Sequence, residues 1–342
     1  METKIIVKGK EVGLYTIKNS KGMYAEVTNF GTKIIKLIVA DKNGSFDDVV
    51  LGFDTLQENI DKEPYFGTTC GRYANRIKNG KFTLNGVEYT LAQNNGGNAL
   101  HGGIEGFNAK VWDVVKVSDN SITMFYQSKD GEEGYPGTLD CHVTYTVTEE
   151  NELRIDYLAT TDKPTVIGLT NHSYFNLKGC GNGTVKDHVL QINADFHTVL
   201  DDTASPIGEI RPVDNSPFDF RKPVVIGDVI DAQEYVPGRG IDNNWTIIKK
   251  QPKELALAAT LYEPASGRVM EVLTTQPGVQ IYTANWVEKQ IGKYGKTFGE
   301  QDSVCLETQN FPNSPNVAHF PSSVLNVNEK YEEVCIYRFS TK

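Results

Sequence analysis

The sequence lacks any long hydrophobic run, and this absence limits where the protein can work. The first residues, METKIIVKGKEV, carry charges at Glu2, Lys4, Lys8 and Lys10. No segment is apolar over the length of a signal-peptide core or a membrane span. We therefore expect a cytoplasmic protein that does not insert into membranes. A mature periplasmic form, with its signal peptide removed, stays open at this stage.

Cysteine pairs and metal-ligand motifs are also missing. Five cysteines are present, an odd number, and no CxxC pair occurs. Reduced, mostly buried thiols in a cytoplasmic protein are the simplest interpretation. No HxxxH spacing or His/Asp cluster is present, and no GxGxxG segment follows a strand-like run. We expect no metal, no nicotinamide and no other cofactor.

Positive charge is in deficit. The 342 residues include 34 Lys and Arg against 44 Asp and Glu, which gives a net charge of −10. A surface of that sign repels phosphate backbones and anionic lipid headgroups. Nucleic acid and membranes are therefore not expected as partners. The expected partner is a small molecule, bound by a monomer or a weak homodimer.

Helical signals are few, and alternating patterns dominate instead. In the stretch CHVTYTVT, the residues Cys141, Val143, Tyr145 and Val147 share one face of a predicted strand. Several other short runs, such as ITMFYQS, ELRIDY and EVCIYRFS, are rich in β-branched and aromatic residues. No alternation of strands with helices is visible, which argues against a Rossmann sheet or a TIM barrel.

Two local signals mark a turn and a helix. Asn85–Gly86 separates two strand-like runs and predicts a hairpin with a type I′ turn. The stretch DTLQENIDK predicts one short helix, with Asp54 as its N-cap and Gln57 three residues later in a weak capping box.

The chain length corresponds to about two average domains. However, no linker, composition shift, internal repeat or low-complexity segment divides the sequence, and its 31 glycines and 14 prolines are spread throughout. The sequence therefore predicts an all-β protein, a single large antiparallel β-sandwich over residues 1–342 with few short helices.

Five stretches carry polar residues where strands are expected to end. They are CGRYANRIKNG (70–80), NNGGNALHGG (94–103), TNHSYFNL (170–177), GRGIDNNW (238–245) and LETQNFPNSPN (306–316). Taken singly, each has an ordinary structural explanation, such as a surface arginine, a turn, a structural histidine or a solvated carboxylate. The functional reading of the second stretch is a histidine on a loop whose glycines let the backbone approach a ligand.

Together these stretches supply two histidines, two carboxylates and an arginine, each expected on a loop: His101, His172, Asp242, Glu307 and Arg76. Nearby Tyr and Trp side chains could stack on the apolar face of a sugar ring. This combination suits a neutral polyhydroxylated ligand. Composition and spacing do not say which reaction occurs.

The same stretches, in the same order, resemble those of the aldose 1-epimerase (galactose mutarotase) family. The resemblance extends from about Asn29 to Phe320, and TNHSYFNL and LETQNFPNSPN are its most specific parts. It implies a large β-sandwich, in agreement with the alternating patterns. It also implies an isomerase that interconverts the α and β anomers of free aldohexoses such as galactose and glucose, in hexose metabolism.

The resemblance also implies roles for individual residues. Glu307 corresponds to the catalytic base and His172 to the catalytic acid, while His101 supports the substrate near the ring oxygen. The residues expected to bind the sugar are Asn75, Arg76, His101, Tyr174, Asp242 and Gln280. One departure affects the pocket edge, because Asn243 follows Asp242 where many relatives place a histidine.

The residue types fit this chemistry. To open the ring, a base removes the proton of the C1 hydroxyl while an acid protonates the ring oxygen. The aldehyde then rotates about C1–C2 and closes on its other face. Glutamate and histidine have reference pKa values of about 4.3 and 6.5, which suit such a pair near neutral pH. No nucleophile, metal or redox cofactor is required.

Three other functions remain as alternatives. A non-catalytic sugar-binding module could use the same aromatic and hydroxyl contacts. A glycoside hydrolase would use two carboxylates, for which Glu307 and Asp242 could be nominated. An epimerase of phosphorylated hexoses would need further cations, for which Arg72, Arg221 and Arg239 are available.

Overall fold

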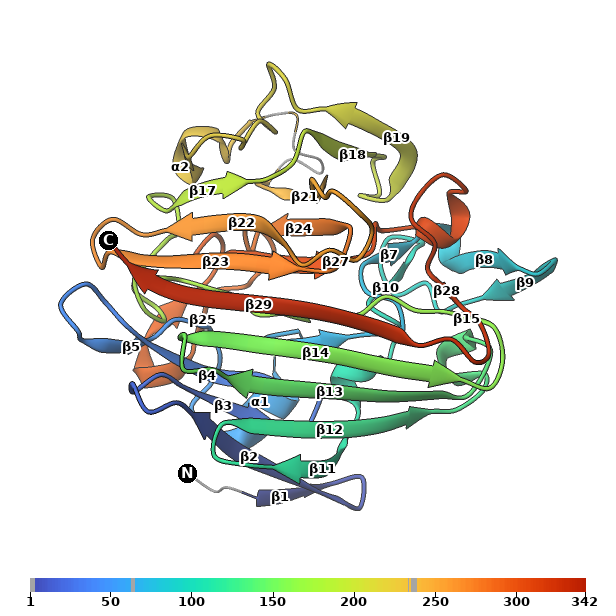
Figure 1. The fold of residues 1–342 in the computed structure, drawn as a ribbon, viewed down its shortest axis with the longest axis horizontal. Coiled ribbons are helices and arrows are strands. Elements are labelled where there is room, and N and C mark those ends of the chain that lie inside the picture. Colours follow the sequence, from blue (N-terminus) through green and yellow to red (C-terminus); the bar gives the residue numbers. More distant parts are fainter. Residues whose placement is uncertain (1–3, 63–64, 233, 235–238) are drawn as a thin grey trace.

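The computed structural model describes residues 4–62, 65–232, 234 and 239–342, and antiparallel strands are the main regular structure of this part (Figure 1). The largest layer is a nine-stranded sheet. Its strands, in spatial order, are β11 (Asp113–Val117), β12 (Ser121–Ser128), β13 (Leu139–Val147), β14 (Glu152–Thr161), β29 (Tyr331–Thr341), β23 (Arg268–Thr274), β22 (Ala256–Tyr262), β17 (Val189–Ile192) and β20 (Val224–Val225).

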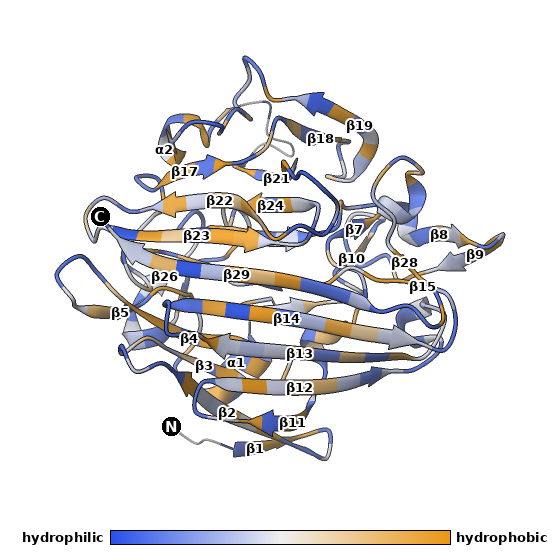
Figure 2. Cartoon of the chain, viewed as in Figure 1, coloured by the Kyte–Doolittle hydropathy of each residue, from blue (hydrophilic) through white to orange (hydrophobic). Residues whose placement is uncertain are grey.

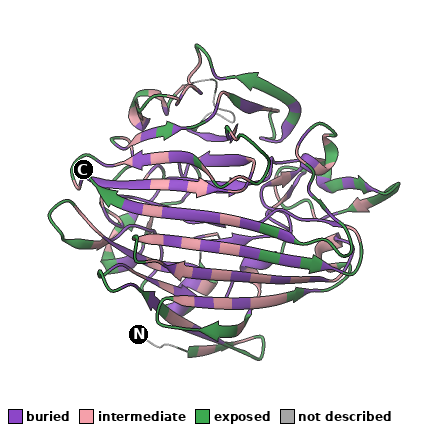
Figure 3. Cartoon of the chain, in the orientation of Figure 1, coloured by how far each residue is buried: buried purple, intermediate pink, exposed green. Residues whose placement is uncertain are grey.

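The predicted alternation is confirmed in this sheet. Along β13 every second residue is buried, and Cys141, Val143, Tyr145 and Val147 all belong to the buried set. Hydrophobic and hydrophilic residues alternate along β14 in Figure 2, and buried and partly exposed positions alternate in the same strands in Figure 3. One face of each strand therefore packs on the core, because side chains point to opposite faces at successive positions.

Two five-stranded sheets share this core. The first contains β1 (Lys4–Val7), β2 (Lys10–Lys18), β3 (Tyr24–Thr28), β4 (Ile34–Ala40) and β5 (Phe46–Asp48), in that order. The second contains β19 (Pro206–Pro212), β18 (Phe196–Leu200), β21 (Asp242–Thr246), β24 (Gly278–Tyr282) and β27 (Cys305–Gln309). One apolar cluster joins all three sheets, with Val27 from the first, Leu306 from the second and Val143 from the nine-stranded layer. The sandwich prediction is confirmed.

The second five-stranded sheet positions polar side chains. Leu306 of β27 packs in the apolar cluster, and its carbonyl oxygen accepts a hydrogen bond from the Tyr337 hydroxyl of β29 at 3.1 Å. Its neighbours Cys305 and Glu307 must face the other way. All five residues of β27 are nevertheless buried. At β27 both faces of this sheet are thus shielded from solvent, and Glu307 lies on the face opposite the apolar cluster.

Short two-stranded ribbons connect the layers. They are β6 (Thr68–Cys70) with β16 (Thr170–His172), β7 (Arg76–Ile77) with β10 (Ala99–Leu100), β8 (Lys81–Leu84) with β9 (Val87–Thr90), β15 (Thr165–Val166) with β28 (Val324–Leu325), and β25 (Gln290–Ile291) with β26 (Thr297–Phe298). The β8–β9 ribbon confirms the predicted hairpin. Asn85 and Gly86 both have positive φ, 52° and 79°, as a type I′ turn requires.

The predicted helix is α1 (Leu56–Asp61), but its predicted cap is wrong by one residue. Thr55 is the N-cap, since its Oγ1 accepts from the backbone N–H of Glu58 and the Glu58 carboxylate accepts from the Thr55 N–H. The Asp54 carboxylate instead accepts from the backbone N–H of Tyr294. The only other α-helix in the described residues is α2 (Ile226–Val229).

Two expectations about composition can be compared with the described residues. All five cysteines are buried and free, as expected of reduced thiols. Across the described ranges, no helix combines the length and the apolar character that crossing a bilayer demands.

Candidate active site

Strand register brings the expected carboxylates and amides to one face. Asp242 of β21 lies opposite Tyr282 of β24, which lies opposite Cys305 of β27. One row further along the same face, Gln280 lies opposite Glu307. Side chains at positions i and i+2 of a strand point to the same side. Asp242, Tyr282, Cys305, Gln280 and Glu307 therefore all face the same side of this sheet.

A cavity of about 230 Å³ opens on this surface. Seven of its lining residues were expected from the sequence: Asn75, Arg76, His101, His172, Tyr174, Asp242 and Glu307. They come from distant parts of the chain, because β16 pairs with β6 and β7 pairs with β10 beside the second five-stranded sheet. The structure therefore brings the expected residues together, although this alone does not test their roles.

The centre of the cavity holds a histidine–carboxylate pair. His172 Nε2 lies 3.5 Å from Glu307 Oε1, and the two side chains are 5% and 2% exposed. His172 Nδ1 and Glu307 Oε2 are buried without a hydrogen-bond partner among the described residues. Buried polar atoms are rarely left unpaired in folded proteins. These two atoms therefore point to a bound ligand or to water.

Burial reverses the usual order of the two pKa values. It lowers the pKa of His172 to about 3, since the imidazolium is poorly solvated there. Burial, and then the charge of Asp242, raise the pKa of Glu307 well above its usual value, while Arg76 opposes that shift. The pair without ligand is therefore shifted toward a protonated Glu307 and a neutral His172.

His101 is held in one tautomer beside this pair. Its Nδ1 accepts a hydrogen bond from the backbone N–H of Asn75 at 3.2 Å, so the ring proton of the neutral form lies on Nε2. Burial, followed by the charges of His172 and Arg76, lowers the pKa of His101 well below its usual value and keeps it neutral. Its ring lies 5.1 Å from that of His172 and 4.7 Å from that of Tyr65. His101 can thus donate one hydrogen bond to a ligand oxygen.

Gly102 of the His101 loop packs closely against another segment of backbone. Gly102 has a φ of 90°, and a Cβ atom there would lie 1.9 Å from the carbonyl oxygen of Gly71. His101 itself adopts a positive φ of 50°. Gly102 therefore serves close packing of two backbone segments, whereas a Cβ atom at Gly96 or Gly97 would meet nothing within 4 Å.

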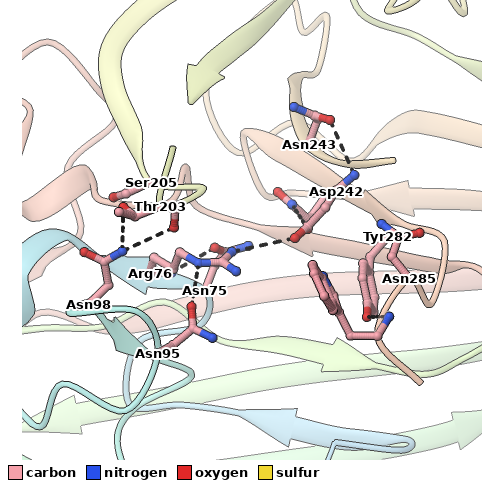
Figure 4. Close-up of polar contacts among 12 residues, drawn as sticks. Asn75, Arg76, Asn95, Asn98, Thr203, Ser205, Asp242, Asn243, Tyr282 and Asn285 are labelled. Carbon is pink, nitrogen blue, oxygen red and sulfur yellow. Dashed lines mark hydrogen bonds and ion pairs between the residues drawn. The ribbon is translucent and has the colours of Figure 1, made fainter. Parts of the chain in front are cut away.

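Arg76 and Asp242 form the polar wall of the cavity (Figure 4). Arg76 Nη1 lies 3.8 Å from Asp242 Oδ2, and its Nε donates to Asn95 Oδ1 at 3.1 Å. Gln280 Nε2 donates to Asp242 Oδ1 at 2.7 Å. Gln280 is not among the residues that line the cavity, so it holds Asp242 from behind. The wall offers a guanidinium and a carboxylate, which suit the hydroxyl groups of a neutral ligand.

The expectation that Arg76, His101, His172, Asp242 and Glu307 all lie on loops is wrong for four of the five. Arg76 is the first residue of β7, His172 is the last of β16, Asp242 is the first of β21 and Glu307 is the middle residue of β27. Backbone hydrogen bonds to neighbouring strands fix each of these strands in place. The side chains therefore extend from a rigid backbone. Such a rigid setting suits catalytic groups better than a loop does.

Arg72 is neither a surface arginine nor a ligand-binding one. It is 2% exposed, and its guanidinium donates to the carbonyl oxygens of Pro136 and Gly137 and to Ser128 Oγ. Its role is to hold these loops together in the interior. Arg76, four residues later, lies in the cavity wall.

Sequence reasoning missed six lining residues: Tyr65, Asn95, Leu100, Tyr282, Trp286 and Val287. Tyr282 could have been found, because it lies two residues after Gln280 on the same predicted strand and so shares its face. Trp286 and Tyr65 lie in connections between elements, and alternation carries no signal for them.

The structure has two further features, a possible metal-ligand cluster beside this cavity and a larger cavity with a different lining. His172, Cys305 and Glu307 each offer one possible metal-ligand atom, and these atoms all lie within 4.8 Å of one another. A second cavity, of about 1000 Å³, includes Lys249, Tyr331 and Glu333 in its lining but none of the residues expected at the active site.

Comparison with protein families and known proteins gives a consistent result. Residues 13–338 match the family model described as Aldose 1-epimerase. The chain is 44% identical to a galactose mutarotase from Sus scrofa over 322 residues, which cover 94% of this chain and 92% of that protein. It is 42% identical to the galactose mutarotase of Homo sapiens, covering 92% and 90% of the two chains. An aldose 1-epimerase of Escherichia coli is 31% identical, with 97% and 96% covered.

Solved structures agree with these sequence matches. A GalM/aldose epimerase homologue from C. elegans superposes with a TM-score of 0.89 at 34% identity, covering 96% of this chain and 99% of the other. A galactose 1-epimerase from Lactobacillus acidophilus superposes with a TM-score of 0.84 at 26% identity, covering 98% and 97%.

Proposed function

The chain belongs to the aldose 1-epimerase family and interconverts the anomers of aldoses, and we propose that Glu307 and His172 are its base and acid. The observation that carries this assignment is the buried pair itself. The two side chains lie 3.5 Å apart at the centre of the cavity, and each has a polar atom without a partner among the described residues. Such a pair can share one proton, and the two atoms without partners can form hydrogen bonds with a ligand that enters the cavity.

The reaction follows from these positions. When the sugar binds, the single proton of the pair first moves from Glu307 to His172. The Glu307 carboxylate then removes the proton from the C1 hydroxyl while the His172 imidazolium gives its proton to the ring oxygen. The C1–O5 bond breaks and leaves an open-chain aldehyde. After rotation about C1–C2, the 5-hydroxyl attacks the other face of the aldehyde. The two protons return to the groups from which they came.

The electrostatics of the site favour the open-chain stage. After both proton transfers, Glu307 is protonated and His172 is neutral. Burial raises the pKa of Glu307 and lowers that of His172, which shifts the pair toward this protonation state. The protein thereby stabilises the state that accompanies the aldehyde. Proton transfer by a positioned group typically contributes about 10²–10⁴ in rate.

The other lining residues are proposed to hold the sugar. His101 donates from Nε2 toward the ring oxygen, because its Nδ1 is already engaged by Asn75. Arg76 and Asp242 bind hydroxyls, with Gln280 fixing Asp242. The aromatic ring of Tyr174 stacks 4.9 Å from the ring of His172 and forms part of the apolar floor. The further role of Tyr174 is to position both the sugar and the acid.

Free aldohexoses, with galactose first among them, are the proposed substrates. The mammalian relatives are named galactose mutarotases, which supports galactose. Two of the three arginines that a phosphorylated sugar would need are engaged elsewhere. Arg72 is buried against carbonyl oxygens, and Arg221 is bonded to the carboxylates of Asp214 and Asp219. Arg239 lies 4.5 Å from the ring centre of Trp286.

Polarimetry on freshly dissolved α-D-galactose and α-D-glucose tests this assignment. The protein should speed the relaxation of optical rotation for both sugars, while Glu307→Gln at equal concentration should approach the buffer rate. NMR on the same samples should show that only C1 changes configuration. Rotation that relaxes no faster than in buffer at micromolar protein would favour a non-catalytic sugar-binding module.

We further propose a single domain over residues 1–342, a cytoplasmic location, and a monomer or weak homodimer that binds neither nucleic acid nor membranes. The shared apolar cluster of the three sheets supports the single domain. Light scattering over a range of protein concentrations tests the oligomeric state, and one cooperative thermal transition tests the domain.

A further inference from the structure

We propose that Zn²⁺ binds between His172, Cys305 and Glu307 and inhibits the enzyme by occupying the place of the sugar. The inhibition rests on the function proposed above, whereas the metal binding can be measured without it. The motivating observation is that three different ligand atoms, one from each side chain, lie within 4.8 Å of one another. His172 and Glu307 line the cavity, and Cys305 is buried beside them.

The geometry of the cluster is close to that of a zinc site. Zn²⁺ binds sulfur at about 2.3 Å and nitrogen or oxygen at about 2.0–2.2 Å, so neighbouring ligands of a tetrahedral site lie roughly 3–4 Å apart. The three candidate atoms, which all lie within 4.8 Å of one another, are close to this spacing. Cys305 and Glu307 occupy positions i and i+2 of β27, so strand geometry already aims both toward the same side.

The ligand atoms are available. His172 Nδ1 and Glu307 Oε2 have no hydrogen-bond partner among the described residues, although both side chains are almost fully buried. Cys305 is a free thiol.

The chemistry of the donors selects the ion. A nitrogen, a sulfur and a carboxylate oxygen suit Zn²⁺, whereas Mg²⁺ and Ca²⁺ prefer oxygen ligands alone. On binding, the Cys305 thiol loses its proton to solvent and its sulfur becomes a zinc ligand. His172 and Glu307 both line the cavity, which provides the entry path and leaves the fourth position open to water.

Inhibition follows because the metal would use the two groups assigned to proton transfer. A bound Zn²⁺ withdraws the lone pair of His172 and the carboxylate of Glu307 from the sugar. Binding of metal and sugar is then mutually exclusive, so galactose should weaken the apparent affinity for Zn²⁺ and Zn²⁺ should raise the apparent KM for galactose.

Calorimetry with ZnCl₂ and absorption spectroscopy with CoCl₂ test the site directly on the full-length protein. We expect one Zn²⁺ per chain and, with Co²⁺, a thiolate-to-metal charge-transfer band. Cys305→Ala should abolish that band and weaken Zn²⁺ binding by about tenfold or more, the range found when support of a metal site is lost. Cys180→Ala is the matched control, because Cys180 is equally buried in the same apolar cluster as Cys305.

Polarimetry with and without ZnCl₂ completes the test. Zn²⁺ should inhibit competitively with galactose, EDTA should restore the full rate, and Cys305→Ala should resist inhibition while keeping most of its activity. Zn²⁺ binding that is equal in both cysteine variants, inhibition that galactose does not relieve, or activation by Zn²⁺ would each overturn the proposal. If Zn²⁺ binds as expected but the protein never speeds mutarotation, the proposed function fails and the metal site stands.

Discussion

The protein contains a small cavity and a large one, and they differ in how their polar groups are satisfied. The small cavity measures about 230 Å³ and holds His172 and Glu307, whose outer atoms are buried and unpartnered among the described residues. The large cavity measures about 1000 Å³. There the Glu333 carboxylate accepts from Thr275 Oγ1 at 2.5 Å, and Lys249 donates to the carbonyl oxygens of Glu254 and Thr274.

This difference separates a reactive site from an architectural one. Polar groups that are bonded to the protein itself stabilise the fold and have little left to offer a ligand. Polar groups that are buried without partners are costly unless a ligand or water completes them. We therefore propose that the chemistry takes place in the small cavity, where His172 and Glu307 have atoms without partners among the described residues, rather than in the larger one.

The largest expected effect is the loss of either member of the buried pair. Glu307→Gln keeps the shape of the side chain but removes the base, and His172→Asn removes the acid. Each should lower kcat by roughly 10²-fold or more if proton transfer limits the rate, with smaller changes in KM. Polarimetry on purified variants measures this. Circular dichroism provides the control for folding.

A folded Glu307→Gln protein with near wild-type kcat would contradict the assignment of the base. Asp242 would then be the first candidate, because it is the other carboxylate that lines the cavity.

The second prediction concerns pH and depends on the reversed pKa values. Between the lowered pKa of His172, about 3, and the raised pKa of Glu307, the pair holds one proton. Since one proton is what catalysis requires, kcat/KM should stay level through pH 6.5 and fall only near pH 3, where His172 takes up a second proton and the pair no longer contains a proton acceptor. Rates measured in each buffer without protein are the control. A fall in kcat/KM centred near pH 6.5 would contradict the prediction, because His172 would then titrate like an exposed histidine.

Asp242→Asn sharpens the same experiment. The Asp242 carboxylate raises the pKa of Glu307, so its removal should lower that pKa and move the alkaline limb of kcat/KM to lower pH. An alkaline limb that stays in place would mean that burial alone sets the proton affinity of Glu307.

The third prediction concerns the wall of the small cavity. Arg76→Ala and Asp242→Ala should raise KM by about tenfold, because each loses hydrogen bonds between a charged group and the sugar, worth about 1.5–3 kcal/mol. His101→Gln should fall between these variants and the catalytic pair, since it both holds the sugar and donates near the ring oxygen. Separate kcat and KM values decide this. An unchanged KM in Arg76→Ala would remove Arg76 from the sugar site.

Many of the proposed site residues could be identified from the sequence, but their burial within strands could not. Alternation identified the strand β13 because one of its faces is buried and the other is partly exposed. The same rule fails for β27, where all five residues are buried and polar Glu307 does not mark a solvent face. The resemblance to a family identified the proposed site residues, whereas the alternating pattern alone placed Glu307 at the end of a strand, as a solvated carboxylate.

Two other features required the three-dimensional structure. The reversal of the pKa values of Glu307 and His172 comes from burial and, for Glu307, also from the charge of Asp242. Asp242 lies 65 residues before Glu307 in the sequence. Trp286 and Tyr65 reach the cavity from connections whose path depends on the packing of whole sheets. No local pattern encodes such contacts.

The smallest expected effect comes from the large cavity and completes the comparison. Lys249→Met should leave kcat and KM unchanged, because Lys249 is bonded to backbone carbonyls and does not line the small cavity. It should instead change how stability depends on pH. Burial lowers the pKa of Lys249 to about 8, while the carboxylates of Glu333 and Glu254 oppose the shift.

The sign of this change follows from proton uptake on unfolding. Between pH 8 and about 10.5 the unfolded chain binds more protons at Lys249 than the folded protein does, so the wild type gains stability as pH rises through this window. Lys249→Met lacks this gain. The stability of Lys249→Met relative to the wild type should therefore decline between pH 7 and pH 10, by up to about 1 kcal/mol, a small value because the ammonium is partly exposed. Urea unfolding at pH 7 and pH 10 measures the difference, with Lys250→Met as the control for loss of one surface charge. A tenfold change in kcat/KM for Lys249→Met would instead show that the large cavity takes part in catalysis.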